Sequence, residues 1–120
     1  DAGVSWQTPW PGKVALTAGF ATGSGDGNVS DGTDGNFRQT GLHKNKGRFF
    51  GVNRFRYYGE LTRPELANLN VSTLAVGVPF FEASSAELVY HRYWQSRAAT
   101  SLRDIRIDAP LDGVRRDVGE

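Results

Sequence analysis

Apolar and polar residues alternate along parts of the chain, and this alternation predicts β-strands over about residues 13–22, 67–81 and 86–98. Successive side chains of a strand point to opposite faces, so a two-residue period sorts them by face. In the first range the larger apolar side chains share one face, and the other face carries small or polar residues. The apolar set is Val14, Leu16, Ala18 and Phe20.

The third range separates its side chains in the same way, with one exception. One face carries Leu88, Tyr90 and Trp94, and the other carries Glu87, His91, Gln95 and Arg97. Arg92 falls on the apolar face, which argues against contact with lipid unless it lies near the strand end, where a long side chain can reach a polar boundary. His91 lacks companions at metal-ligand spacing, so we interpret it as a hydrogen-bonded wall residue.

Two architectures place such strands differently. In a soluble β-sandwich the apolar face forms the core and the other face meets solvent. In a transmembrane barrel the apolar face meets lipid and the other face borders a lumen. The second face of residues 13–22 is short-chained for a solvent face, which favours the barrel. The range 67–81 is also longer than a usual globular strand and suits a tilted spanning strand.

The segment before the first of these strands contains two tryptophans beside turn residues. Residues 1–12 include Pro9, Pro11 and Gly12, and they predict the end of a strand followed by a tight turn. Trp6 and Trp10 flank this turn. They could anchor a soluble core or form an aromatic girdle at a membrane interface, and the local sequence does not separate the two.

The other connections alternate between short and long. Residues 82–85 predict a short turn, whereas about 23–66 and 99–116 predict long loops, and 117–120 the start of a further strand. Short turns at one end and long loops at the other are typical of outer-membrane barrels. We therefore interpret residues 1–120 as one incomplete, all-β, antiparallel segment of a transmembrane β-barrel.

Composition excludes several classes of protein and site. The net charge of +1 rules out a strongly basic protein as a whole, so positive charge is local. The absence of cysteine excludes disulfides and thiolate metal sites. No run of about 18 apolar residues is present, so the sequence predicts no transmembrane helix.

The first long loop begins with Gly, Asp, Asn and Ser residues that cannot pack a core. Asp26, Asp31 and Asp34 are candidate oxygen ligands for Ca²⁺. Their spacing does not fit the EF-hand, which needs glycine at its sixth position and glutamate at its twelfth. We therefore interpret this part as a solvated loop, with a calcium site as the weaker alternative and no other cofactor expected.

The rest of that loop, residues 37–60, is basic and aromatic. Its Lys/Arg residues are Arg38, Lys44, Lys46, Arg48, Arg54 and Arg56, and its only acid is Glu60. Such a density of cations indicates a site for an anion. A two-residue period over 49–60 suggests a short strand or ribbon with Arg54 and Arg56 on one face. The plainer interpretation is an exposed loop whose arginines pair with the aspartates upstream.

Five segments in order resemble the alginate export family of outer-membrane porins. They are FATGSGD, FRQTGLHKNKGRF, YYGELTRPELANLNVSTL, AELVYHRYW and DVGE, which together cover nearly the whole chain. The resemblance implies a C-terminal portion of a barrel of about eighteen strands. It also implies that the long loop folds inward and contributes basic side chains to a pore constriction.

The resemblance implies site residues only where the motifs match. The basic residue four positions after QTGL is Lys46, where the family commonly has arginine. The basic residue five positions before Gly59-Glu60 is Arg54, with Arg56 near it. Lys44 and Arg48 accompany them in the predicted constriction. A ring of fixed cations lowers the entry barrier for a polyuronate, and weak binding at many sites allows it to leave.

The leading hypothesis is therefore a channel in the outer membrane of a Gram-negative bacterium that exports alginate or a similar anionic exopolysaccharide. Its expected partners are that polysaccharide, outer-membrane lipid and periplasmic components of a secretion complex, without nucleic acid. The alternative is a soluble β-sandwich module that binds acidic glycans or nucleic acid through the same basic patch. A polyuronate lyase is disfavoured because no acid–base constellation assembles at suitable spacing, so we expect no enzyme.

Overall fold

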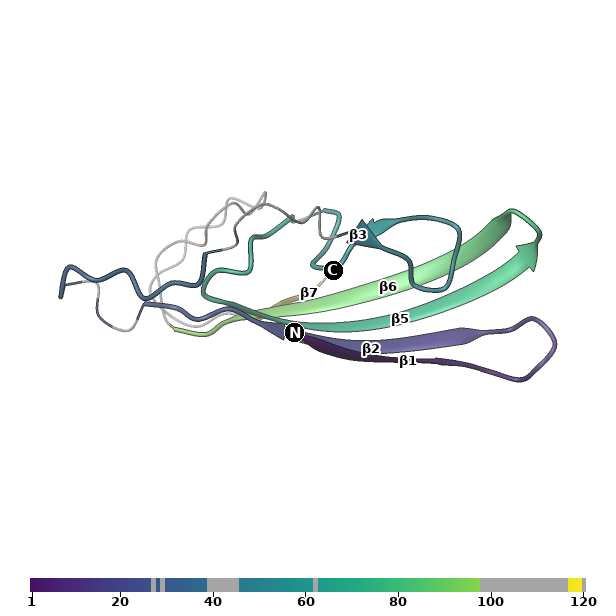
Figure 1. Ribbon diagram of the computed structural model, residues 1–120, viewed down its shortest axis with the longest axis horizontal. Coiled ribbons are helices and arrows are strands. Elements are labelled where there is room, and N and C mark those ends of the chain that lie inside the picture. Colours follow the sequence, from purple (N-terminus) through teal and green to yellow (C-terminus); the bar gives the residue numbers. More distant parts are fainter. Residues whose placement is uncertain (27, 29, 39–45, 62, 98–116, 120) are drawn as a thin grey trace.

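The computed structural model describes residues 1–26, 28, 30–38, 46–61 and 63–97, and the backbone of 117–119. Five strands form one antiparallel sheet in the order β1-β2-β5-β6-β7 (Figure 1). They are β1 (Ala2–Gln7), β2 (Ala15–Thr22), β5 (Leu69–Phe81), β6 (Ser84–Gln95) and β7 (Asp117–Gly119). A second, two-stranded sheet pairs β3 (Lys46–Gly47) with β4 (Phe55–Arg56).

The predicted all-β, antiparallel fold class is confirmed, with small differences in strand ends. β2 and β5 begin two residues later than the ranges predicted from 13 and 67. β6 begins at Ser84 because the turn that precedes it occupies only Glu82 and Ala83. The loop predicted over 99–116 lies outside the described residues. No helix long and apolar enough to cross a membrane occurs in the part of the chain that the structure describes.

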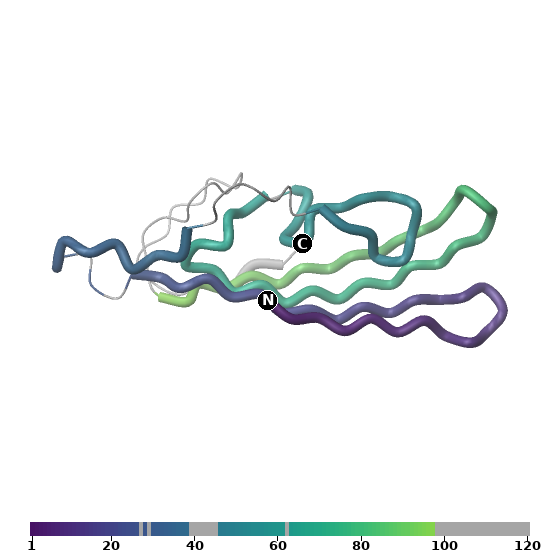
Figure 2. The backbone as a smooth tube through the Cα atoms, in the orientation of Figure 1, coloured from purple at the N-terminus to yellow at the C-terminus, as the bar shows by residue number. Residues whose placement is uncertain are grey.

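The tight turns lie at one end of the sheet, and the connection from β2 to β5 leaves from the other end (Figures 1 and 2). The first turn is closed by backbone hydrogen bonds from Thr8 N–H to the Val14 carbonyl and from Lys13 N–H to the Trp10 carbonyl, at 2.8 and 3.0 Å. Trp6 is 54% exposed and Trp10 is 65% exposed. These exposures exclude the role of a core anchor for both tryptophans.

The two faces of the sheet have opposite character, and the larger apolar side chains lie on the exposed one. We call it the apolar face; its members are Val4, Trp6, Leu16, Ala18, Phe20, Leu74, Val76, Leu88 and Tyr90. Leu74 is 59% exposed and Leu88 is 74% exposed. A soluble β-sandwich would bury these side chains in its core. The exposed apolar face therefore favours the barrel over the sandwich.

The opposite face carries small side chains and is covered by the loop, so we call it the loop-covered face. Its members in β2 and β5 are Ala15, Thr17, Gly19, Ala21, Val71, Thr73, Ala75 and Gly77. In Figure 2 the segment around β3 and β4 runs back over the sheet. The loop end is the end of the sheet from which the connection from β2 to β5 leaves. A core lies near it, with Tyr58 packed against that core; its members are Ala21, Leu66, Leu69, Val71 and Tyr93.

Asn68 joins three chain segments at the loop end. Its backbone N–H donates to the Ser24 carbonyl, and its carbonyl accepts from Ser96 N–H. Its side-chain oxygen accepts from Arg97 N–H at 2.7 Å, and its side-chain nitrogen donates to the Arg97 carbonyl at 3.0 Å. Side chains at Gly23 and Gly25 would overlap with Leu66 and Asn68. This explains why the segment FATGSGD needs both glycines.

Candidate functional site

The basic loop docks on the loop-covered face through its backbone. The Phe49 carbonyl lies where a side chain at Gly77 would stand, and a side chain at Gly51 would overlap with the Glu87 carboxylate. Val52 N–H donates to Ser85 Oγ at 2.8 Å. Gly77 thus permits a close approach of the Phe49 backbone that any larger residue would prevent, whereas a larger residue at position 51 would require the Glu87 side chain to move.

Aromatic side chains hold the loop together and attach it to the wall. Phe49 is 4% exposed, and its ring centroid lies 6.3 Å from that of Phe55 and 6.0 Å from that of Tyr57. The Tyr93 hydroxyl of β6 donates to the Tyr58 carbonyl at 2.7 Å. The rings of Phe49, Phe55 and Tyr57 thus pack against one another, and Tyr58 attaches the loop to the sheet.

The strand expected over residues 49–60 is realised only at Phe55–Arg56. Phe50 and Gly59 have φ angles of 62° and 113°, and both break an extended backbone. Arg54 therefore precedes β4 and is exposed, while Arg56 lies in β4 and is half-buried. The predicted short strand thus includes Arg56 but not Arg54.

The β3–β4 pair places two cations opposite each other. Lys46 is the register partner of Arg56, and like charges directly across a strand pair repel. Glu60 offsets part of this charge: its carboxylate accepts a hydrogen bond from Arg56 N–H at 3.1 Å and lies 3.7 Å from Arg56 Nε. It also forms an ion pair with Arg63 at 3.9 Å. Glu60 thus lies among the cations as a local counter-charge.

A cleft of about 490 Å³ separates the loop from β1 and β2. Its loop side carries Arg48, Phe49, Tyr57 and Tyr58, and its wall side includes Gly3, Ser5, Thr17, Gly19 and Thr73. Arg48 and Tyr57 are exposed. A guanidinium beside aromatic rings and wall hydroxyls can bind a carboxylate, a sugar ring and a sugar hydroxyl together.

Tyr58 and Thr73, which line this cleft, each make a polar contact. The Tyr58 hydroxyl donates to the Asp1 carboxylate at 3.1 Å, and burial raises the pKa of Tyr58, so the phenol stays neutral. Thr73 Oγ1 lies 2.9 Å from His91 Nδ1, and both side chains are buried. The interpretation of His91 as a hydrogen-bonded wall residue is confirmed.

The five predicted constriction residues thus fall in different places. Lys46 and Arg48 are exposed in β3 and the residue after it, Arg54 is exposed before β4, and Arg56 is half-buried beside Glu60. Lys44 lies outside the described residues. Sequence reasoning missed Ser85 and Glu87 as docking partners, because nothing local links them to a loop more than thirty residues away.

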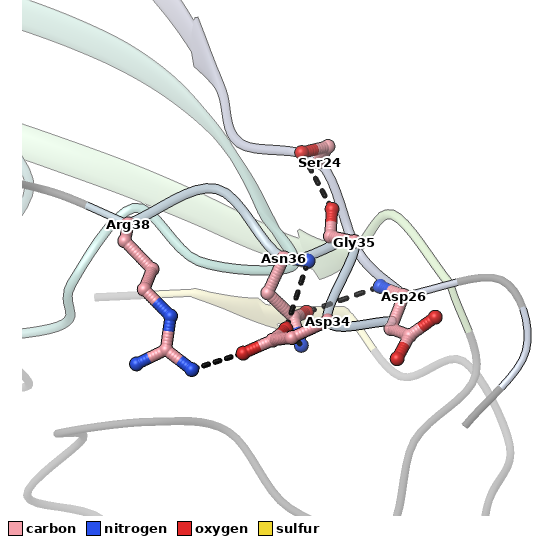
Figure 3. A network of polar contacts seen from close by, with 6 residues as sticks. All are labelled: Ser24, Asp26, Asp34, Gly35, Asn36 and Arg38. Atoms are coloured by element: carbon pink, nitrogen blue, oxygen red, sulfur yellow. Dashed lines mark hydrogen bonds and ion pairs between the residues drawn. The ribbon is translucent and has the colours of Figure 1, made fainter. Parts of the chain in front are cut away.

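The aspartate-rich start of the loop is organised by hydrogen bonds among its own residues (Figure 3). Asn36 Oδ1 accepts from Asp26 N–H, and Ser24 Oγ donates to the Gly35 carbonyl. Asp34 accepts from Asn36 N–H and pairs with Arg38. These contacts, Asn36 N–H first, lower the pKa of Asp34 to about 2. No group of three or more metal-ligating side chains forms within the described ranges.

These contacts test the plainer interpretation of the basic stretch. Arg38 does pair with an aspartate of the upstream loop, as that interpretation expects. Arg56 pairs instead with Glu60, within the basic stretch itself. The loop is also fixed to the wall by Phe49 and Val52, so it is not simply a solvated chain.

The family profile described as alginate export matches residues 1–120. The chain belongs to the alginate export family. The alginate production protein AlgE of Pseudomonas aeruginosa is 35% identical over 121 residues, which cover all of this chain and 24% of that protein. AlgE of Azotobacter vinelandii is 33% identical over 96 residues, which cover 79% of this chain and 19% of that protein.

Family membership confirms the resemblance and carries two further points. The family's description is one of export and not of a catalysed reaction, in agreement with the prediction that the chain is no enzyme. The chain spans about a quarter of the length of the Pseudomonas aeruginosa relative, and less of the Azotobacter one. The site described above therefore belongs to a segment much shorter than those relatives.

Proposed function

We propose that this chain forms part of an outer-membrane β-barrel channel that exports an anionic polysaccharide, alginate or a similar polyuronate. The observation that carries the proposal is the sidedness of the sheet. Apolar side chains are exposed, while a basic loop covers the face of small residues. A spanning barrel needs that arrangement, with lipid outside and a charged lumen inside.

The length of β6 suits a bilayer. From Ala86 to Trp94 the strand covers about 27 Å at about 3.4 Å per residue, or about 20 Å along the membrane normal for a tilt of about 40°. Phe80, Phe81 and Trp10 are exposed at the turn end. Phe20 and Trp94 lie against each other nearer the loop end, with ring centroids 5.9 Å apart. These rings are placed as the two aromatic girdles of such a barrel are.

The chemistry of the loop suits a polyuronate. Lys46, Arg54 and Arg56 supply cations, and Arg48 faces the cleft with Tyr57 beside it. Each uronate brings a carboxylate and a sugar ring, which a guanidinium and an aromatic ring bind weakly in water. Weak contacts repeated along a polymer permit transit, whereas one strong site would retain it. The name of both relatives, alginate production protein, supports the same cargo.

The test uses the full-length protein that carries this chain, reconstituted in a planar lipid bilayer under a salt gradient. Replacement of both arginines (Arg54→Glu and Arg56→Glu) should turn anion preference into cation preference, visible as a change of sign in the reversal potential. Lys13→Glu makes a charge reversal of the same kind at the tight turn and should leave the sign unchanged. Unaltered selectivity in the double variant would contradict the assignment of Arg54 and Arg56 to the constriction.

A further inference from the structure

The Glu60 carboxylate lies between two guanidinium groups at ion-pair distance. Its Oε2 atom is 3.7 Å from Arg56 Nε and 3.9 Å from Arg63 Nη2. A charge-assisted hydrogen bond between such groups is about 2.7–2.9 Å long, so neither contact is one. Arg56 Nε is buried and has no hydrogen-bond partner among the described residues. Glu60 therefore offsets the charge of both arginines but leaves the Nε–H donor of Arg56 unused.

Backbone groups fix the position of this carboxylate. Glu60 Oε1 accepts from Arg56 N–H at 3.1 Å, across the turn in which Gly59 N–H donates to the Arg56 carbonyl. Arg63 Nε donates to the Glu60 backbone carbonyl at 3.0 Å, which places its guanidinium beside the same residue. The three charged side chains are each 37–38% exposed, so an anion from solution can reach them.

Glu60 is outnumbered by the cations around it. Lys46 is the register partner of Arg56, and Arg63 joins them through its ion pair with Glu60. The cluster therefore keeps an excess of positive charge with Glu60 in place. An incoming carboxylate is attracted to it, yet must share the guanidiniums with a fixed group of the same chemistry.

We propose that Glu60 weakens the binding of the polyuronate by the basic loop, and that Arg63 belongs to the same site. The Glu60 carboxylate competes with the uronate carboxylates for the guanidiniums of Arg56 and Arg63, so each bound unit leaves quickly. This inference deepens the proposed function and rests on it. A channel needs such weak binding, because fixed cations that held the polymer tightly would stop its transit.

A purely structural role of Glu60 would depend on its hydrogen bond with Arg56 N–H. Glu60→Gln separates the two roles, since glutamine keeps a side-chain oxygen that can accept from that N–H but carries no charge. Arg63→Gln removes one guanidinium of the cluster. Glu82→Gln, at the exposed tight turn between β5 and β6, is the matched control for the loss of one acid.

The experiment measures block of the ion current through the full-length protein in a planar lipid bilayer, with an oligomannuronate of uniform length as the probe. Glu60→Gln should lengthen the dwell time of each block about fivefold, and Arg63→Gln should shorten it by a similar factor, the effect of one charge at a half-exposed pair. Glu82→Gln should keep the wild-type dwell time. A neutral manno-oligosaccharide of the same length should not distinguish the variants.

Salt provides a readout that a structural effect would not change. Between about 0.1 M and about 1 M salt the screening length falls from about 10 Å to about 3 Å, so the dwell-time ratio of Glu60→Gln to wild type should fall toward one. A dwell time in Glu60→Gln equal to or shorter than that of the wild type overturns the proposal, and so does a ratio that salt does not change. If oligomannuronate does not block the wild type at all, the proposed function fails as well, so the two failures give different results.

Discussion

Single residues of unusual conformation mark where the loop end of the sheet is fixed. Asn68 is 7% exposed, has a φ angle of 53° and makes hydrogen bonds to both Ser24 and Arg97. Asparagine tolerates the left-handed region better than most residues, and its side chain can mimic a backbone amide. One residue thus satisfies the ends of β2, β5 and β6 together.

Asn68→Ala should lower the free energy of unfolding by about 2–3 kcal/mol, from lost side-chain hydrogen bonds and the cost of alanine at positive φ. Asn68→Gly loses the same bonds but accepts the φ angle, so it should cost about 1 kcal/mol less. Urea unfolding of the full-length protein in lipid vesicles, followed by tryptophan fluorescence, measures both. Equal costs for the two variants would contradict the role assigned to the backbone conformation.

At the scale of elements, the long strands follow from sequence and the loop's docking does not. Alternation such as Leu16, Ala18 and Phe20 identifies a strand from neighbouring residues alone. The β3–β4 pair has two residues per strand, too few for any period. The contacts of Phe49 with Gly77 and of Val52 with Ser85 join segments far apart in the chain, and local patterns carry no information about such pairs. Charge density and motif resemblance therefore located the basic residues, while their neighbours required the three-dimensional structure.

Gly77 offers a test of that docking. Gly77→Val would place its side chain on the Phe49 carbonyl and displace the loop, even though valine favours a strand. This overpacking should destabilise the docked loop by about 1–2 kcal/mol. Because trypsin cuts the undocked loop, the rate of cleavage after Arg48, Arg54 and Arg56 should rise roughly tenfold. Gly19→Ala lies on the same face, with its nearest neighbours 3.8 Å away, and should change little. Cleavage of Gly77→Val at the wild-type rate would show that the loop is not held there.

For the whole molecule, the sheet separates two environments, and substitutions on its two faces should differ accordingly. The apolar face is continuous across β1, β2, β5 and β6 along register-matched rows such as Trp6, Leu16, Val76 and Leu88. Side chains on the loop-covered face contact the cleft or the loop. A charged side chain should therefore destabilise the protein strongly on the apolar face only.

Leu74→Arg should destabilise the full-length protein in lipid vesicles by about 2–4 kcal/mol, because it places a cation near the middle of the apolar face. Ser5→Arg adds the same charge on the cleft side and should cost well under 1 kcal/mol, the usual range for a surface substitution. Urea titration in vesicles compares the two directly. Similar costs would mean that the two faces meet the same solvent.

The opposition of Lys46 and Arg56 across β3 and β4 links cargo to the loop's own stability. Two cations held as register partners repel each other, and Glu60 forms an ion pair with Arg56. A polyuronate carboxylate between them would act as their counter-ion, so the loop would be most rigid while occupied and loosen as each unit leaves. Salt would imitate part of this effect by screening. Under the proposed function, the passing polymer would therefore help to order the loop that selects it.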